Sequence, residues 1–195
     1  MAGGLILTKL SVPRIRQSLV KRPRLLEKLD AGVDGKLTLV SAPAGYGKTT
    51  LVANWLFQSV NRVTPRFCWL SLDIEDNDPV QFVTYLTGTL QSIDHGLGQE
   101  LSGLLHAQQG PDIQAFIAAM IDAVFRLDME IAIVLDDYHR IVNQPIHDAL
   151  AFLLEHQPPH GVVADQSALY GLLSKLRDLG LELITVNSVD HVQEV

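Results

Sequence analysis

The sequence predicts an α/β fold in which a parallel sheet is covered by helices on both faces. Short runs of almost only apolar residues alternate along the chain with segments whose apolar residues recur at helical spacing. The apolar runs lack the polar alternation of a half-exposed strand, which is typical of parallel strands buried on both faces. Apolar residues make up 47% of the 195 residues, which is enough for a full core.

The composition also excludes several functional classes. The formal net charge of -7 argues against general affinity for nucleic acid. The one cysteine, Cys68, lies in an apolar run, so it cannot form an internal disulfide and fits a reducing compartment as a small core residue. No apolar run approaches the roughly 20 residues of a membrane span. We therefore expect a soluble, cytoplasmic protein that contacts neither DNA nor a membrane directly.

The first elements lead to a glycine-bearing turn. Residues 22–29 have leucines on one helical face, and Pro23 suits the first turn of a helix. Residues 37–41 are almost all apolar and predict the first strand. Residues 42–47 form the turn, and the apolar pattern over 48–60 predicts the helix that follows.

The middle of the chain repeats the alternation. We predict a second strand over residues 66–73, a helix that begins after Asp78, and a third strand over 131–135. A further helix is expected from Asp112 onward. Four glycines favour a loop or a broken helix over residues 94–110.

The remaining elements surround two adjacent prolines. A helix starts near Pro145 and ends before Pro158-Pro159. A helix over 165–179 and a strand over 181–186 follow. We expect that last strand to fill the slot between strands 37–41 and 131–135. The aspartates and glutamate between residues 73 and 78 predict a solvated loop.

The turn after the first strand has a recognisable spacing. It reads Ala42-Pro43-Ala44-Gly45-Tyr46-Gly47-Lys48-Thr49. This is the phosphate-binding P-loop, in which glycine, four residues, and Gly-Lys-Ser/Thr follow a strand and open a helix, except that Ala42 replaces the first glycine. The alternative is a turn between strand and helix that binds nothing.

Each position of this turn has an expected role. We predict that backbone amides from Ala44 to Gly47, a stretch that includes Gly45 and Tyr46, cradle the phosphates of a bound nucleotide. The start of the following helix adds free N–H groups and a positive dipole end. Lys48 supplies a charge for the β- and γ-phosphates, the Thr49 hydroxyl is a ligand for Mg²⁺, and Thr50 reaches the α-phosphate.

A pair of carboxylates follows the third strand. Asp136 and Asp137 come directly after the apolar run 131–135, as in a Walker B strand. We predict that Asp136 holds Mg²⁺ opposite Thr49 and that Asp137 polarises the attacking water. The alternative is a solvated strand end.

Several segments together resemble one family. They are Leu7-Thr8-Lys9-Leu10, Val20 to Leu25, Ser41 to Thr50, Trp69 to Asp73, Asp76-Asn77-Asp78-Pro79 and Leu135-Asp136-Asp137-Tyr138-His139. In this order they resemble the N-terminal P-loop ATPase domain of the large ATP-binding LuxR-type regulators, which are STAND signalling ATPases of the maltose-activator kind. The resemblance covers about residues 5–160.

The resemblance implies a fold and a role. It implies a three-layer α/β/α P-loop NTPase domain that acts as an ATP/ADP switch in transcription regulation, with Arg22 near the base or ribose. Lys48 and Asp137 would then support slow ATP hydrolysis at most. Self-association or contact with other regulator domains is the expected partnership.

The chain departs from the family after Pro159. Residues 161–195 contain a single arginine, Arg177, and no counterpart of the family's sensor arginine or of its DNA-binding part. They instead resemble the final helix and strand of short uncharacterised bacterial proteins. We therefore predict a truncated nucleotide-binding domain over residues 1–160 and a helix-strand appendage over 161–195. A free-standing P-loop ATPase or kinase, and a non-functional remnant, remain as alternatives.

Overall fold

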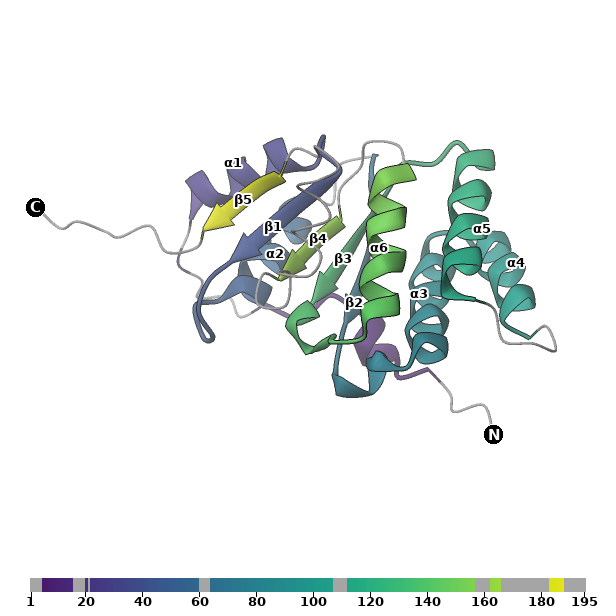
Figure 1. Ribbon diagram of the computed structural model, residues 1–195. Helices are drawn as coiled ribbons and strands as arrows, with labels where there is room; N and C mark the ends of the chain where they lie inside the picture. Colours follow the sequence, from purple (N-terminus) through teal and green to yellow (C-terminus); the bar gives the residue numbers. More distant parts are fainter. Residues whose placement is uncertain are drawn as a thin grey trace, which may run out of the picture.

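The computed structural model shows a mixed α/β protein built on one parallel sheet (Figure 1). The structure describes residues 5–15, 20, 22–59, 64–106, 112–156, 162–165 and 183–187. The five strands lie in the order β2-β3-β4-β1-β5. Their bounds are β1 Leu37–Ser41, β2 Arg66–Ser71, β3 Ile131–Asp136, β4 Val162–Asp165 and β5 Leu183–Asn187. All four strand pairings are parallel.

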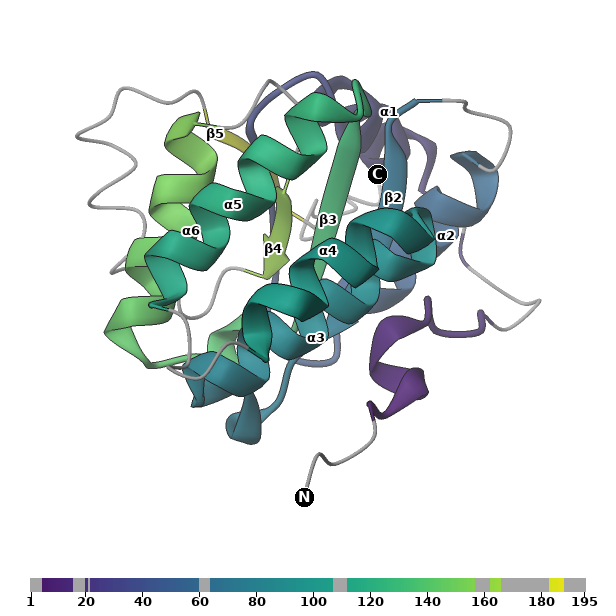
Figure 2. The ribbon, with the colours of Figure 1, turned by 90° about the vertical axis from the view of Figure 1, so that its right-hand side faces the viewer.

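Helices cover both faces of the sheet, as predicted (Figure 2). On one face, Val40, Trp69 and Val134 pack against α1 (Pro23–Gly32) and α2 (Lys48–Gln58). On the other, the alternate strand residues pack against three helices, namely α3 Pro79–Ile93, α5 Ile113–Arg126 and α6 Gln144–His156. Side chains alternate along each strand, so both faces of β1, β2 and β3 are apolar because both are buried.

The prediction of a loop or broken helix over residues 94–110 was wrong for residues 95–105, and its last four residues lie outside the described part of the chain. Residues His95–Leu105 form the continuous helix α4, which packs on α3 (Figure 2). Asp94 caps it by accepting a hydrogen bond from the Leu97 amide at 2.8 Å. A Cβ on Gly98 would lie 2.4 Å from Gln91 Cβ, so this glycine permits the close approach of α3 and α4 and does not break the helix.

The predicted place of the last strand was also wrong. β5, which overlaps the predicted strand over 181–186, lies at the sheet edge beside β1. The slot between β1 and β3 is filled by β4, for which we predicted no strand. Both strands therefore belong to the same sheet as residues 37–41. The helix predicted over 165–179 lies outside the described residues.

The acidic loop after β2 is not simply solvated. Its short 3₁₀ helix η3 (Ile74–Asn77) buries Asp76 completely. The buried Lys9 ammonium, from the 3₁₀ helix η1 (Leu7–Leu10), lies 2.5 Å from Asp76 and 3.0 Å from Asp73. It also lies 4.2 Å from the centre of the Tyr85 ring. A paired charge can be buried where an isolated one cannot, and Lys9 provides that pairing from the N-terminal segment.

Candidate functional site

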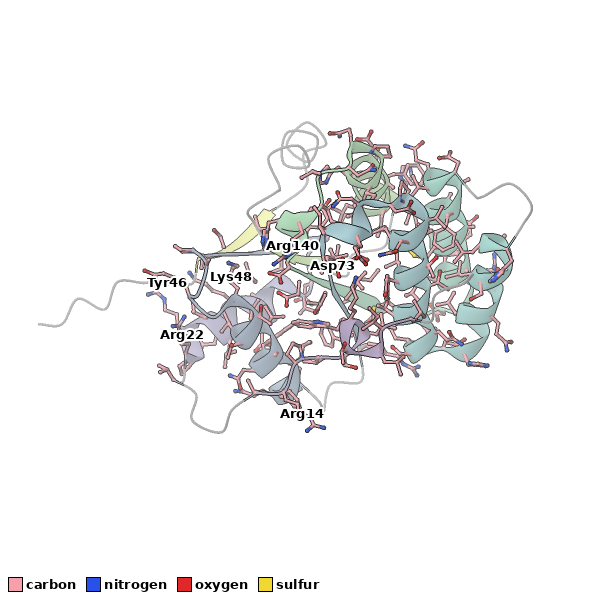
Figure 3. All side chains as sticks on the ribbon, turned by 90° about the horizontal axis from the view of Figure 1, so that it is seen from below. Arg14, Arg22, Tyr46, Lys48, Asp73 and Arg140 are labelled. Atoms are coloured by element: carbon pink, nitrogen blue, oxygen red, sulfur yellow. The ribbon has the colours of Figure 1, made fainter. Side chains whose placement is uncertain are left out.

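The predicted site residues gather at the carboxyl edge of the sheet. Because all strands are parallel, the segments that follow β1, β2 and β3 emerge at the same edge. Figure 3 views this edge from below, with Tyr46 and Lys48 after β1, Arg140 after β3 and Asp73 after β2. This is the place where ligands bind in open parallel sheets.

The loop between β1 and α2 has the backbone that its glycines predict. Gly45 and Gly47 have φ of 84° and 79°, in the left-handed region that other residues rarely adopt. Gly47 is the residue before α2, and no side chain caps this helix. The first N–H groups of α2 are therefore available to an anion.

Other helices in the chain show what α2 lacks. Three of them begin after an aspartate whose carboxylate accepts a hydrogen bond from a first-turn amide, namely Asp78 for α3, Asp94 for α4 and Asp112 for α5. Each carboxylate fills the anion position at its helix end. At α2 no side chain fills that position.

Lys48 folds back over the loop. Its ammonium donates hydrogen bonds to the carbonyl oxygens of Ala42 at 2.8 Å and Pro43 at 3.4 Å. Ala42, which replaces the usual glycine, thus contributes a backbone acceptor for which no glycine is required. A phosphate bound at the start of α2 would compete with these carbonyls for the Lys48 ammonium.

Thr49 and Asp136 come together across the sheet edge. The Thr49 hydroxyl donates a 2.9 Å hydrogen bond to Asp136 Oδ1, and Asp136 is almost fully buried. Among the described residues, no group of three or more His, Cys, Asp or Glu side chains could hold a metal ion by itself. Two converging oxygens fit Mg²⁺, which in such sites takes its remaining ligands from phosphate and water.

A cavity of about 440 Å³ opens beside the loop. The described residues that line it are Val20, Arg22, Gly45, Tyr46, Gly47, Thr50, Leu51 and Asn54. Arg22 thus lines the same cavity as Gly45, Gly47 and Thr50. Ala44 is exposed on the loop and does not line the cavity. Sequence reasoning missed Val20, Leu51 and Asn54, although Asn54 follows Thr50 by one helical turn and shares its face.

Asp137 lies next to this centre but not in the cavity. It has φ of 56°, and its carboxylate is partly exposed, 3.7 Å from His139 Nδ1. The sharp turn at Asp137 leads into the 3₁₀ helix η4 (Tyr138–Arg140). The structure therefore brings Thr49 and Asp136 into contact and leaves Asp137 on the rim.

The turn after β3 is held in place by a contact with α6. Tyr138 is fully buried, and its hydroxyl lies 2.5 Å from His147 Nδ1 on α6. Burial raises the pKa of Tyr138 because the phenolate would lose its solvation, so the hydroxyl stays protonated. This contact holds the segment that carries Asp136 and Asp137 against the helix layer.

Comparisons with known proteins give two kinds of match, one to a family of regulators and one to a domain family. HTH-type transcriptional regulator MalT of Yersinia pestis (strain Pestoides F) and that of Yersinia enterocolitica are each 39% identical to it over 154 residues. These alignments cover 79% of this chain and 16% of each relative, so most of the chain is a MalT-like region. Residues 159–187 match a family model described as a domain of unknown function, DUF8691. In the described part of the chain, no helix could cross a membrane.

Proposed function

We propose that this chain contains a P-loop NTPase domain that binds Mg-ATP or Mg-ADP. The observation that carries the proposal is the start of α2, which a left-handed glycine leaves uncapped while Thr49 meets Asp136 at 2.9 Å. Together these groups offer free amides, a cation and two oxygen ligands within a few residues of one another. This combination suits a phosphate chain that carries a magnesium ion.

Different residues of the site contact different parts of the proposed ligand. Loop amides from Ala44 to Gly47 and the first turn of α2 bind the phosphate oxygens. Lys48 exchanges its carbonyl partners for the β- and γ-phosphates, and Thr50 approaches the α-phosphate. A bound Mg²⁺, held by Thr49 and Asp136, would neutralise charge on those phosphates. Asp137, on the rim, orients the attacking water.

The cavity beside the loop suits the nucleoside. Arg22 and Tyr46 give it a flat cation and an aromatic ring, and Val20 and Leu51 add apolar surface. These side chains can stack on a base or contact a ribose. We propose adenine as the base, on the resemblance to ATP-binding regulators.

The role we propose is that of a switch in a transcription regulator. The MalT-like region supports a STAND-type module of the LuxR kind, in which the bound nucleotide sets the conformation and any hydrolysis is slow. The chain spans 16% of the length of those relatives, so DNA binding is not proposed for it. Its partners would be a further copy or other regulator domains.

We also propose a division of the chain at residue 160. Residues 1–160 supply the described side chains of the candidate site, and residues 161–195 supply β4 and β5. In this view the second part completes the sheet and leaves the chemistry to the first.

Hydrolysis of bound ATP tests the switch against its alternatives. Wild type and Lys48→Ala are mixed with a limiting amount of ATP and Mg²⁺, and bound nucleotide and released phosphate are followed together. A switch retains ADP and turns over slowly, and Lys48→Ala loses the complex. Rapid turnover that Lys48→Ala abolishes would indicate an ATPase or kinase. Absence of any complex would indicate a remnant.

A further inference from the structure

The turn after β3 presents one arginine whose backbone is held on two sides. The Arg140 amide donates to the Asp137 carbonyl at 3.0 Å, and the Arg140 carbonyl accepts from Asn77 Nδ2 at 2.8 Å. Arg140 therefore keeps a fixed place four residues after Asp136.

Asn77 connects this turn to the loop after β2. Its Oδ1 accepts from the amides of Val142 at 2.7 Å and Asn143 at 3.1 Å, and its carbonyl accepts from Asn143 Nδ2 at 2.8 Å. The Asn77 side chain thus joins the two loops with three hydrogen bonds, and its backbone carbonyl accepts a fourth. The backbone around Arg140 is thus rigid, although the residue itself is exposed.

Among the described residues, the Arg140 guanidinium makes no hydrogen bond or ion pair, whereas Arg126 on α5 pairs with Glu100. In Figure 3 Arg140 lies on one side of Lys48, and Arg22 with Tyr46 on the other. In the sheet, β4 separates β3 from β1, the strand that leads into the loop.

In this arrangement, Arg22 and Arg140 would contact opposite ends of a bound nucleotide. The cavity with Arg22 takes the nucleoside, and Thr49 with Asp136 marks the metal between the last phosphates. A phosphate chain that runs from the cavity past Lys48 ends on the β3 side, where Arg140 lies. Resting on the proposed function, we propose that Arg140 binds the terminal phosphate of a nucleoside triphosphate and so distinguishes it from a diphosphate.

A guanidinium suits this task better than an ammonium. It can donate two parallel hydrogen bonds to one phosphate, which gives direction as well as charge. Residues 161–195 hold only Arg177 as an alternative arginine, and it lies outside the described residues. Arg140 would then contact the γ-phosphate from the same segment as Asp136, the proposed ligand of Mg²⁺.

The test compares two nucleotides on three variants of the full chain. Isothermal titration with Mg-ADP and with the Mg complex of a non-hydrolysable β,γ-imido ATP analogue is performed on wild type, Arg140→Gln and Arg140→Lys. Arg14→Gln is the matched control, because Arg14 is also an exposed arginine but lies away from the loop in Figure 3. Far-ultraviolet circular dichroism checks that each variant is folded.

We expect Arg140→Gln to weaken binding of the triphosphate about tenfold and to leave ADP within about twofold. Arg140→Lys falls between, and Arg14→Gln changes neither. Equal losses for both nucleotides, or no loss for either, would overturn the role of Arg140 while leaving the nucleotide site intact. A wild type that binds neither nucleotide would overturn the proposed function, and this inference with it.

Discussion

Thr49 and Asp136 are 87 positions apart, yet the hydroxyl of one donates to the carboxylate of the other at 2.9 Å. Thr49 lies in α2, which follows β1, and Asp136 is the last residue of β3. The two strands are not neighbours, since β4 lies between them in the sheet. The contact therefore fixes the start of α2 against the end of β3. It also defines the two oxygens on which the proposed magnesium site depends.

Asp136→Asn should remove the metal-dependent part of nucleotide binding. The amide keeps the size of the side chain but loses the charge that attracts Mg²⁺, so affinity for ADP with Mg²⁺ falls about tenfold. Affinity measured in the presence of EDTA should stay the same. Thr49→Ser keeps the hydroxyl and serves as the control. Equal losses with and without Mg²⁺ would contradict the assignment.

Gly47→Ala tests the left-handed turn before α2. At φ of 79° a Cβ costs about 1–2 kcal/mol in the free energy of unfolding, although no atom would clash with it, since the nearest atom, Thr50 Cβ, lies at 3.9 Å. Nucleotide affinity should fall too, because relief of the strain moves the loop amides. Urea unfolding measures the first effect and titration with ADP the second.

Gly103→Ala is the matched control for that change. Gly103 lies within α4, and a Cβ there meets nothing within 4 Å. Alanine should raise the free energy of unfolding by about 0.5–1 kcal/mol through helix propensity and leave nucleotide affinity unchanged. If the two glycine variants behaved alike, the argument from φ would be wrong.

Lys9→Met should destabilise the fold. It leaves the fully buried Asp76 carboxylate without its cation, which costs about 3 kcal/mol in the free energy of unfolding. Arg126→Met removes an exposed pair with Glu100 and should cost at most about 1 kcal/mol. Chemical denaturation of both variants checks the contrast, and equal costs would show that burial of the Lys9 pair has no special weight.

The same cluster predicts a loss of stability in acid. Burial opposes ionisation of Asp73, but hydrogen bonds from Lys9 and the Glu75 amide outweigh it and lower the pKa of Asp73 below 3.8. The folded state thus gains stability above pH 3.8 that is lost as the pH falls through the lower folded value. Asp73→Asn should reduce the loss of the free energy of unfolding at acid pH, which denaturation curves at a series of pH values would measure. In a Lys9→Met background the same change should have much less effect.

Lys9 makes stability depend on pH in the opposite direction, at high pH. Desolvation would lower the pKa of Lys9, but the bonds to Asp76 and Asp73 raise it above 10.5. Its contribution is therefore complete below pH 10.5 and is lost only as the pH rises through the higher folded value. The stability that this cluster contributes is therefore greatest between pH 3.8 and pH 10.5.

Most of the strands and the site loop could be predicted from local pattern. β1 and the start of α2 matched their predicted bounds because an apolar run, two glycines and Lys48 mark them within a few residues. Thr49 met Asp136 because parallel strands bring their carboxyl ends to one edge. Such features need only short stretches of sequence.

The errors came from features that depend on distant neighbours. β4 is four residues long and follows two prolines, so it has too few residues for a pattern. The place of β5 depends on which strand edge is free, and β4 had already taken the central slot. Gly98 was read as a helix breaker because its close contact with Gln91 on α3 is invisible in sequence. Asp76 was read as solvated because Lys9 lies 67 residues away.

Titration of the full chain with Mg-ADP tests the central claim most directly. We predict saturable binding of one ADP per chain, which Lys48→Ala weakens strongly and Arg14→Gln leaves unchanged, because Lys48 alone of the two lies over the loop at the start of α2. No binding at millimolar ADP and ATP, with or without Mg²⁺, would contradict the account.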